Sequence, residues 1–107
     1  MKQKKQLIDY LFVGLGASNC LLILELEKRR LLDEKIIIIL EPHQKNKKDK
    51  TYCFWSTSDN VEKIIPLDFI DKEWDEVVLN GKVQSLNPLK YYHVSSLTLY
   101  EKALKII

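Results

Sequence analysis

Two apolar runs separated by a leucine-rich segment dominate the hydrophobic pattern at the start of the chain. The first run, Leu7–Val13, leads into a Gly-x-Gly-x-x-Asn sequence, and the second, Lys35–Glu41, contains four consecutive isoleucines. Between them, leucines recur over a wide face of a helix that we predict from Ala17 to Leu32. An apolar run without alternation is typical of a strand covered on both faces, as in parallel sheets. The pattern therefore predicts a strand–helix–strand unit with parallel strands.

The second half of the chain has a different pattern. An aromatic cluster, Tyr52–Trp55, is followed by a polar stretch and then by two β-type runs, Trp74–Leu79 and Lys82–Leu86, that flank Asn80-Gly81. Asn-Gly between such runs indicates a β-hairpin, because both residues tolerate the positive φ of a type I′ turn. Tyr91–Val94 favours another strand, and the chain closes with a predicted helix over Leu97–Ile107.

Length and composition describe one small globular domain. The chain has 107 residues, 46% of them hydrophobic, which suits a packed core rather than disorder. A formal charge of +2 lacks the clustered basic footprint of a nucleic-acid-binding protein, so we expect no nucleic acid partner. Cys20 and Cys53 form no CxxC pair, so two free thiols are expected rather than a zinc site or a disulfide framework.

The beginning of the chain superficially resembles a secretory signal. Met1–Lys5 is basic and an apolar run follows it, but Asp9 interrupts that run and glycines follow where a longer apolar segment is required. No stretch approaches the ~20 apolar residues of a membrane span. We therefore expect a cytoplasmic protein that is able to touch a membrane surface.

The glycine sequence after the first run is suited to binding a diphosphate. Gly14 permits a sharp turn, Gly16 lets a phosphate approach the backbone, and the following helix directs N–H groups and its positive dipole end at the ligand. The third position of this fingerprint is normally Gly or Ala, whereas here it is Asn19. Asn fits if its amide bonds to local backbone or to the ligand. The alternative is a tight strand–helix turn without any ligand.

Glu41 ends the second run, where an acid accepts hydrogen bonds from the ribose hydroxyls of an adenine dinucleotide. Its charge repels a 2′-phosphate, which favours FAD or NAD over NADP. The alternative is an ordinary exposed glutamate at a strand end.

Other charged residues give weaker indications. Among the lysines between positions 45 and 50, Lys50 is next to the aromatic cluster and is placed to reach a phosphate, while the others are expected to be solvated. His43 and His93 have no partners at ligand spacing and are expected to be surface or packed residues. The acidic residues near position 75, including Asp71, are expected to face solvent without an acid–base role.

The segment Asp49-Lys50-Thr51-Tyr52-Cys53-Phe54-Trp55 resembles a sequence of the flavoprotein lycopene cyclases, Asp-Arg-Thr-Trp-Cys-Phe-Trp, which occupies the same place after the second strand. Some members also carry Asn at the third fingerprint position. Tyr91–Ser96, leading into Leu99 and Tyr100, is similar to a later strand-to-helix segment of the family. The resemblance runs from about Leu7 to the last residue, with Lys50 in place of Arg and Tyr52 in place of Trp.

This resemblance implies an α/β fold: the N-terminal βαβ part of a Rossmann-like FAD-binding domain with a β-hairpin excursion. It implies bound FAD, kept reduced by NAD(P)H, a carotenoid substrate whose ends are cyclised to β-ionone rings, and peripheral contact with a membrane. No catalytic residue is assigned. The expected cofactor-binding residues are Gly14, Leu15, Gly16, Ala17, Ser18, Asn19, Glu41, Lys50 and Thr51.

A doubly wound sheet requires a third parallel strand, and the pattern predicts only two. We therefore expect residues 1–107 to form a single, incomplete FAD-binding domain, the front piece of a longer protein or the product of a truncated gene, inactive by itself. Two alternatives remain open. One is a segment of another FAD enzyme, such as a hydroxylase or polyprenyl reductase, and the other is a non-catalytic remnant or interaction module.

Overall fold

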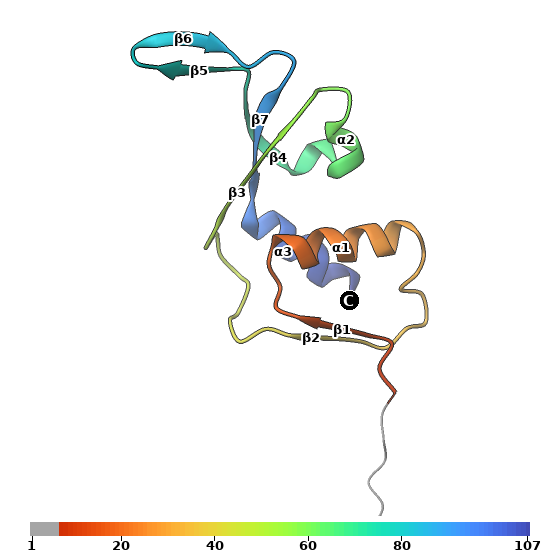
Figure 1. Cartoon of the computed structure of the whole chain (residues 1–107). Helices are drawn as coiled ribbons and strands as arrows, with labels where there is room; N and C mark the ends of the chain where they lie inside the picture. Colours follow the sequence, from red (N-terminus) through yellow and green to blue (C-terminus); the bar gives the residue numbers. More distant parts are fainter. Residues whose placement is uncertain (1–6) are drawn as a thin grey trace, which may run out of the picture. The chain divides into compact units, whose positions relative to one another are not determined.

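The structure is a computed structural model that describes residues 7–107; the basic segment Met1–Lys5 lies outside the described residues. Within this range the fold is mixed α/β, with three α-helices and strands arranged in small sheets (Figure 1). The chain divides into two compact units. The first unit contains the described residues up to Asn46 together with Tyr100–Ile107, and the second contains Lys47–Leu99.

The first unit is built around a strand–helix–strand arrangement. Strand β1 (Tyr10–Val13) and strand β2 (Ile37–Leu40) are parallel and pair in register along their whole length, with α1 (Ala17–Lys28) between them in the sequence. The N–H of Gly14 donates to the carbonyl of Leu40 at 2.7 Å and extends the pairing by one residue. The predicted strand–helix–strand unit with parallel strands is confirmed, although both strands are shorter than expected.

Helix α1 ends at Lys28 rather than at the predicted Leu32, because Arg30 adopts a left-handed conformation with φ of 60°. The N–H groups of Arg30 and Leu31 turn back to carbonyls of the last helical turn at 3.0 and 2.9 Å, as in a Schellman motif. An ion pair of 2.8 Å between the Arg30 guanidinium and the Asp33 carboxylate accompanies this turn. Glycine is the usual residue at such a position, so the helix end carries no obvious sequence signal.

The core of the first unit lies on one side of the β1–β2 pair. Helix α1 and the last turns of α3 (Ser96–Ile106) lie on the same side of this pair (Figure 1). The side chains buried in this unit are those of Phe12, Leu15, Cys20, Ile23, Leu32, Tyr100 and Ala103.

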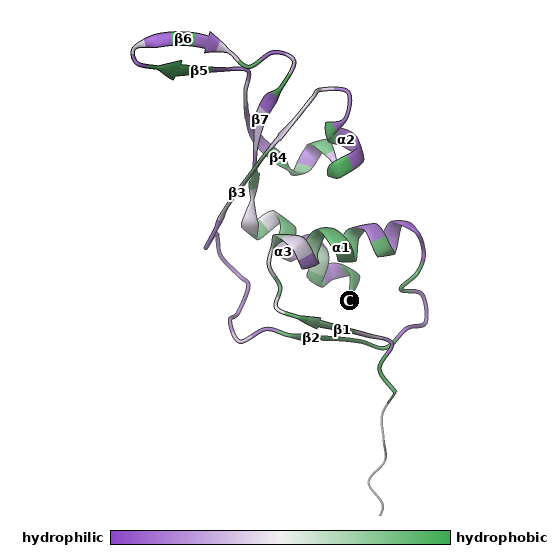
Figure 2. Ribbon diagram, viewed as in Figure 1, coloured by the Kyte–Doolittle hydropathy of each residue, from purple (hydrophilic) through white to green (hydrophobic). Residues whose placement is uncertain are grey.

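The prediction that the second strand is covered on both faces is wrong for the part of the chain that the structure describes. Figure 2 shows hydrophobic residues along both β1 and β2, yet no residue of β2 is buried and its Leu40 is 54% exposed. On β1, Leu11 and Val13 are 53% and 73% exposed. The apolar run fits a strand with two buried faces, but within this unit the helices cover only one of them.

The second unit contains a three-stranded antiparallel sheet that the hydrophobic pattern predicted only in part. Strand β7 (Lys90–Ser95) lies between β3 (Thr51–Ser56) and β4 (Ile70–Trp74). Only β7 was expected, over the slightly shorter range Tyr91–Val94. The β-branched and aromatic residues of β3 are typical of a strand. Strand β4 contains three charged residues, so its sequence does not predict a strand.

Alternation along β7 divides the two faces of this sheet. Tyr92 and Val94 are 2% and 1% exposed and point into the core, where Tyr92 stacks on Phe54 with ring centroids 5.4 Å apart. Tyr91 and His93 lie on the opposite face, as the two-residue period of a strand requires. The residues buried in this unit are Ser56, Val61, Ile65, Phe69, Tyr92, Val94, Ser95, Ser96 and Leu99.

The connections of the second unit are short. Helix α2 (Val61–Ile64) and the 3-10 helix η1 (Leu67–Phe69) lead from β3 into β4. The hairpin formed by β5 (Glu76–Leu79) and β6 (Lys82–Ser85) follows as a separate two-stranded sheet.

The predicted hairpin is confirmed at its turn, where Asn80 and Gly81 have φ of 50° and 78°. Its first strand begins at Glu76 rather than at Trp74, because Trp74 ends β4 and the chain bends at Asp75.

Helix α3 follows β7 without an intervening loop, one residue earlier than the predicted start at Leu97. It contributes Ser96–Leu99 to the second unit and its remaining residues to the first. Across residues 7–107, no helix combines the length and the apolar character needed to cross a membrane.

Two valines on strands of the second unit allow a matched test of its core. Val94 is 1% exposed, whereas Val83 in the hairpin is 65% exposed. We predict that Val94→Ala lowers the free energy of unfolding by about 2 kcal/mol, because it leaves a cavity, and that Val83→Ala changes it by less than about 0.5 kcal/mol. Urea unfolding followed by circular dichroism measures both; equal losses would contradict the assigned faces of β7.

Candidate functional site

Two glycines shape the turn between β1 and α1. Gly14 has φ of 90°, a conformation that favours glycine, and Gly16 is the extended N-cap residue of α1 with φ of −91°. The first helical hydrogen bond runs from the N–H of Cys20 to the carbonyl of Gly16 at 3.0 Å. As a glycine, Gly16 has no side chain that could cap the helix start. The N–H groups of the first turn, from Ala17 to Asn19, therefore have no acceptor within the helix.

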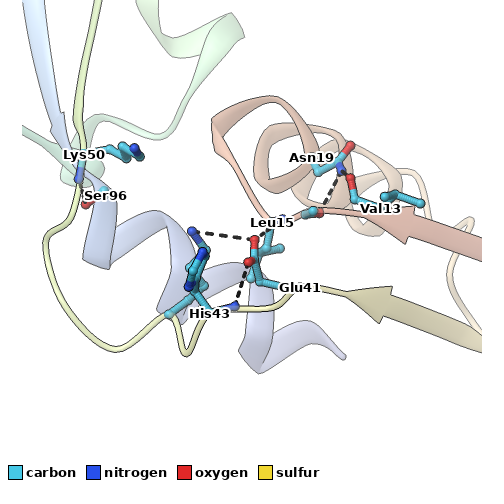
Figure 3. A network of polar contacts seen from close by, with 9 residues as sticks. Val13, Leu15, Asn19, Glu41, His43, Lys50 and Ser96 are labelled. Atoms are coloured by element: carbon cyan, nitrogen blue, oxygen red, sulfur yellow. Dashed lines mark hydrogen bonds and ion pairs between the residues drawn. The ribbon is translucent and has the colours of Figure 1, made fainter.

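Asn19 fixes the shape of this turn. Its side-chain amide donates to the carbonyl of Gly14 at 2.9 Å and to that of Val13 at 3.2 Å (Figure 3). Both amide hydrogens are thereby used on local backbone, one of the two arrangements that the sequence allowed. Asn19 thus positions the turn through backbone contacts.

The carboxylate of Glu41 lies directly at the glycine turn (Figure 3). Oε1 accepts the N–H of Leu15 at 2.9 Å, and Oε2 accepts the N–H of His43 at 3.0 Å. The side chain is only 14% exposed. Hydrogen bonds from the N–H groups of His43 and then Leu15 lower the pKa of Glu41 below its ordinary value, so the group is ionised at neutral pH.

Lys45 is part of this site, although the sequence suggested only a solvated lysine. Its Nζ lies 3.6 Å from Oε1 of Glu41 and 4.8 Å from the ring centroid of Tyr100, and its side chain is 9% exposed. The two charged residues are four positions apart, but they lie in a loop, where such spacing does not predict contact. Lys45 balances the charge of the half-buried Glu41 carboxylate and places a cation beside the turn.

The structure thus brings together Gly14, Leu15, Gly16, Ala17, Ser18, Asn19 and Glu41 in the first unit. Leu15 holds the turn in place with a side chain that is 1% exposed, while Ser18 is exposed. Space remains beside Gly16, because a Cβ built there meets no atom within 4 Å.

Lys50 and Thr51 belong to the second unit, at the start of β3. The backbone N–H of Lys50 lies 3.5 Å from Oγ of Ser96 (Figure 3), and Thr51 is opposite Ser95 in the β3–β7 pairing.

His93 forms a pair with Asp71. Its Nδ1 is hydrogen-bonded to the carboxylate of Asp71, and this bond lowers the pKa of Asp71. The two residues are 22 positions apart and meet because β4 and β7 are neighbours. Since β4 was not predicted, the sequence carried no signal for this pair.

Both cysteines are free thiols in this structure. Burial raises the pKa of Cys20 to about 11, so this thiol is neutral at physiological pH and poorly nucleophilic.

Comparison of the chain with models of known protein families, with curated proteins and with solved structures gives no match.

The depressed pKa of Glu41 predicts a specific acid sensitivity. A carboxylate whose folded pKa is lowered stabilises the fold above its unfolded pKa, and this contribution disappears as the pH falls through the folded value. We expect the thermal midpoint of the natural chain to fall more steeply below pH 4.5, the ordinary pKa of glutamate, than that of Glu41→Gln. Thermal unfolding between pH 7 and pH 3 measures this, with the exposed Glu101→Gln as the matched control. Parallel curves for Glu41→Gln and the natural chain would show that the carboxylate is not held as described.

Proposed function

We propose that the β1–α1 turn and Glu41 bind the diphosphate and the adenosine ribose of FAD. The observation that carries this proposal is the position of the ionised Glu41 carboxylate, 2.9 Å from the N–H of Leu15 within the glycine turn. Dinucleotide sites of strand–helix–strand units hold two adjacent parts of one ligand. The glycine turn after the first strand binds the diphosphate, and an acid at the end of the second strand binds the ribose.

The start of α1 supplies the elements that a diphosphate requires. The N–H groups of Ala17 and Ser18 point out of the N-terminal end of α1. The positive end of the helix dipole lies at the same place. Because a Cβ at Gly16 would meet no protein atom within 4 Å, the glycine leaves room that the protein itself does not fill. These features support contact between phosphate oxygens and the backbone.

Glu41 supplies the second half of the proposed site. An ionised carboxylate has about four acceptor positions, and three partners are present here: the N–H of Leu15, the N–H of His43 and the ammonium of Lys45. An acceptor position on Oε2 therefore remains for a ribose hydroxyl. The negative charge favours FAD or NAD over a cofactor with a 2′-phosphate.

We further propose that this segment belongs to a lycopene β-cyclase-like flavoprotein, in which FAD is reduced by NAD(P)H. The support is the resemblance of Asp49–Trp55, which includes the start of β3, to the sequence of these enzymes. The substrate would be a carotenoid met at a membrane surface by a cytoplasmic protein. In such an enzyme, residues 1–107 would form the cofactor-binding segment of a Rossmann-like domain.

Gly16 gives the sharpest test of FAD binding. A valine at this position has an ordinary φ and an open surrounding, so Gly16→Val should fold normally. Its side chain would occupy the space proposed for the phosphate, and we expect FAD affinity to fall at least about tenfold, the loss of one good contact. Titration of the full chain with FAD, followed by flavin fluorescence and by the amide NMR signals of the turn, measures the change.

Two further variants control this experiment. Glu41→Gln should weaken FAD binding, whereas Glu101→Gln, at an exposed position of α3, should leave it unchanged. Normal FAD binding by a folded Gly16→Val protein would remove the turn from the site, and normal binding by Glu41→Gln would remove the ribose contact.

The enzyme class is tested on the longest protein produced from the gene that encodes this segment. Supplied with lycopene, FAD and NADPH, it should form β-ionone rings without net consumption of NADPH. Consumption of NADPH in proportion to product would instead assign a redox flavoenzyme, such as a hydroxylase or polyprenyl reductase. A protein that binds no flavin would be a non-catalytic module.

A further inference from the structure

A second candidate site is a polar hollow in the second unit, whose lining includes Lys50 and Thr51. It lies where β3 begins and where β7 passes into α3, and its volume is about 230 Å³. All of its lining residues belong to the second unit. They are Lys48, Asp49, Lys50, Thr51, His93, Ser95 and Ser96.

Ser95 is the residue of this hollow whose hydroxyl lacks a hydrogen-bond partner among the described residues. Its side chain follows the alternation of β7 away from the Tyr92 and Val94 core and lies on the same face as Thr51, its cross-strand neighbour. The residue is only 6% exposed, and its Oγ has no hydrogen-bond partner among the described residues. A buried hydroxyl without a partner is costly, so such a group is normally satisfied by protein, water or ligand.

Ser95 does not fulfil the structural role that its position suggests. A serine just before a helix usually caps it by accepting an N–H of the first turn. Since the Ser95 hydroxyl makes no hydrogen bond, it does not cap α3. Helix α3 has 11 residues, and its first-turn N–H groups point toward its N-terminal end. The hydroxyl of Ser95 belongs to the residue just before that end.

The charges around the hollow favour an anion. Lys48 and Lys50 contribute two positive charges and Asp49 contributes one carboxylate, which leaves an excess of one positive charge in the lining. The Nδ1 of His93 is hydrogen-bonded to the carboxylate of Asp71, a residue outside the lining.

We propose that this hollow binds a tetrahedral oxyanion of the phosphoryl class. The hydroxyls of Ser95 and Thr51, the start of α3 and the ammonium groups of Lys48 and Lys50 would donate to its oxygens. The proposal does not depend on FAD binding at the β1–α1 turn, because the residues belong to different units.

Inorganic phosphate is the probe for the test. Titration of the full chain with phosphate, against chloride at equal ionic strength, should give saturable binding by calorimetry and a shift of the Ser95 and Ser96 amide signals in NMR spectra. Ser95→Ala should fold normally, since its Oγ makes no hydrogen bond, yet should weaken phosphate binding at least about threefold, and Lys50→Gln at least about tenfold. Ser58→Ala and Lys63→Gln, both exposed and outside the lining, are the matched controls and should bind phosphate as the natural chain does.

Absence of saturable phosphate binding would overturn the proposal, and so would binding that Ser95→Ala and Lys50→Gln leave unchanged; in either case water alone would satisfy Ser95. Repetition in Gly16→Val separates the two proposals, because phosphate binding should persist there even if FAD binding is lost. Displacement of phosphate by FAD would show that the phosphoryl group belongs to the dinucleotide. Phosphate binding that FAD does not disturb would show a separate oxyanion.

Discussion

The hydrogen bond between the Glu41 carboxylate and the N–H of Leu15 is the contact on which the candidate site depends. It joins residues 26 positions apart and holds the end of β2 against the turn that follows β1. The parallel pairing of the two strands brings these ends to the same edge, because parallel strands share the direction of their carboxyl ends. The amide of Asn19 fixes the other side of the same turn. These contacts therefore fix both the shape of the backbone turn and the position of the Glu41 charge at this edge.

Electrostatic balance explains why an ionised carboxylate is tolerated in a position that is only 14% exposed. Two backbone N–H groups and the ammonium of Lys45 compensate the charge, and Lys45 in turn lies over the ring of Tyr100. Removal of either charged partner would leave the other poorly solvated. The same arrangement gives the proposed ribose contact its polarity, so stability and ligand preference share one set of side chains.

The sequence was sufficient to predict the elements that depend on local chemistry. The glycine turn, the parallel strands and the Asn80-Gly81 hairpin all follow from residue type and period. The early end of α1 was not predictable in this way, because Arg30 occupies a conformation that usually belongs to glycine.

Contacts between segments far apart in the sequence could not be predicted from it either. Strand β4 is rich in charge and has no apolar alternation, so neither it nor the Asp71–His93 pair was expected. The position of Lys45 against Glu41 depends on the path of a loop, and the unsatisfied hydroxyl of Ser95 depends on the β3–β7 register. The sequence therefore identified most of the glycine turn but not the charges that surround it.

The register of β7 has a consequence for how this chain tolerates change. The strand supplies the core with one set of alternate residues and the opposite face with the other, and it pairs with a neighbour on each edge. Insertion or deletion of a single residue would exchange the two sets, placing His93 among apolar side chains and Val94 on the opposite, more polar face. Substitutions on the outer face leave this arrangement intact. The length of the segment from Lys90 to Ser95 is therefore under stricter constraint than the identity of its outward residues.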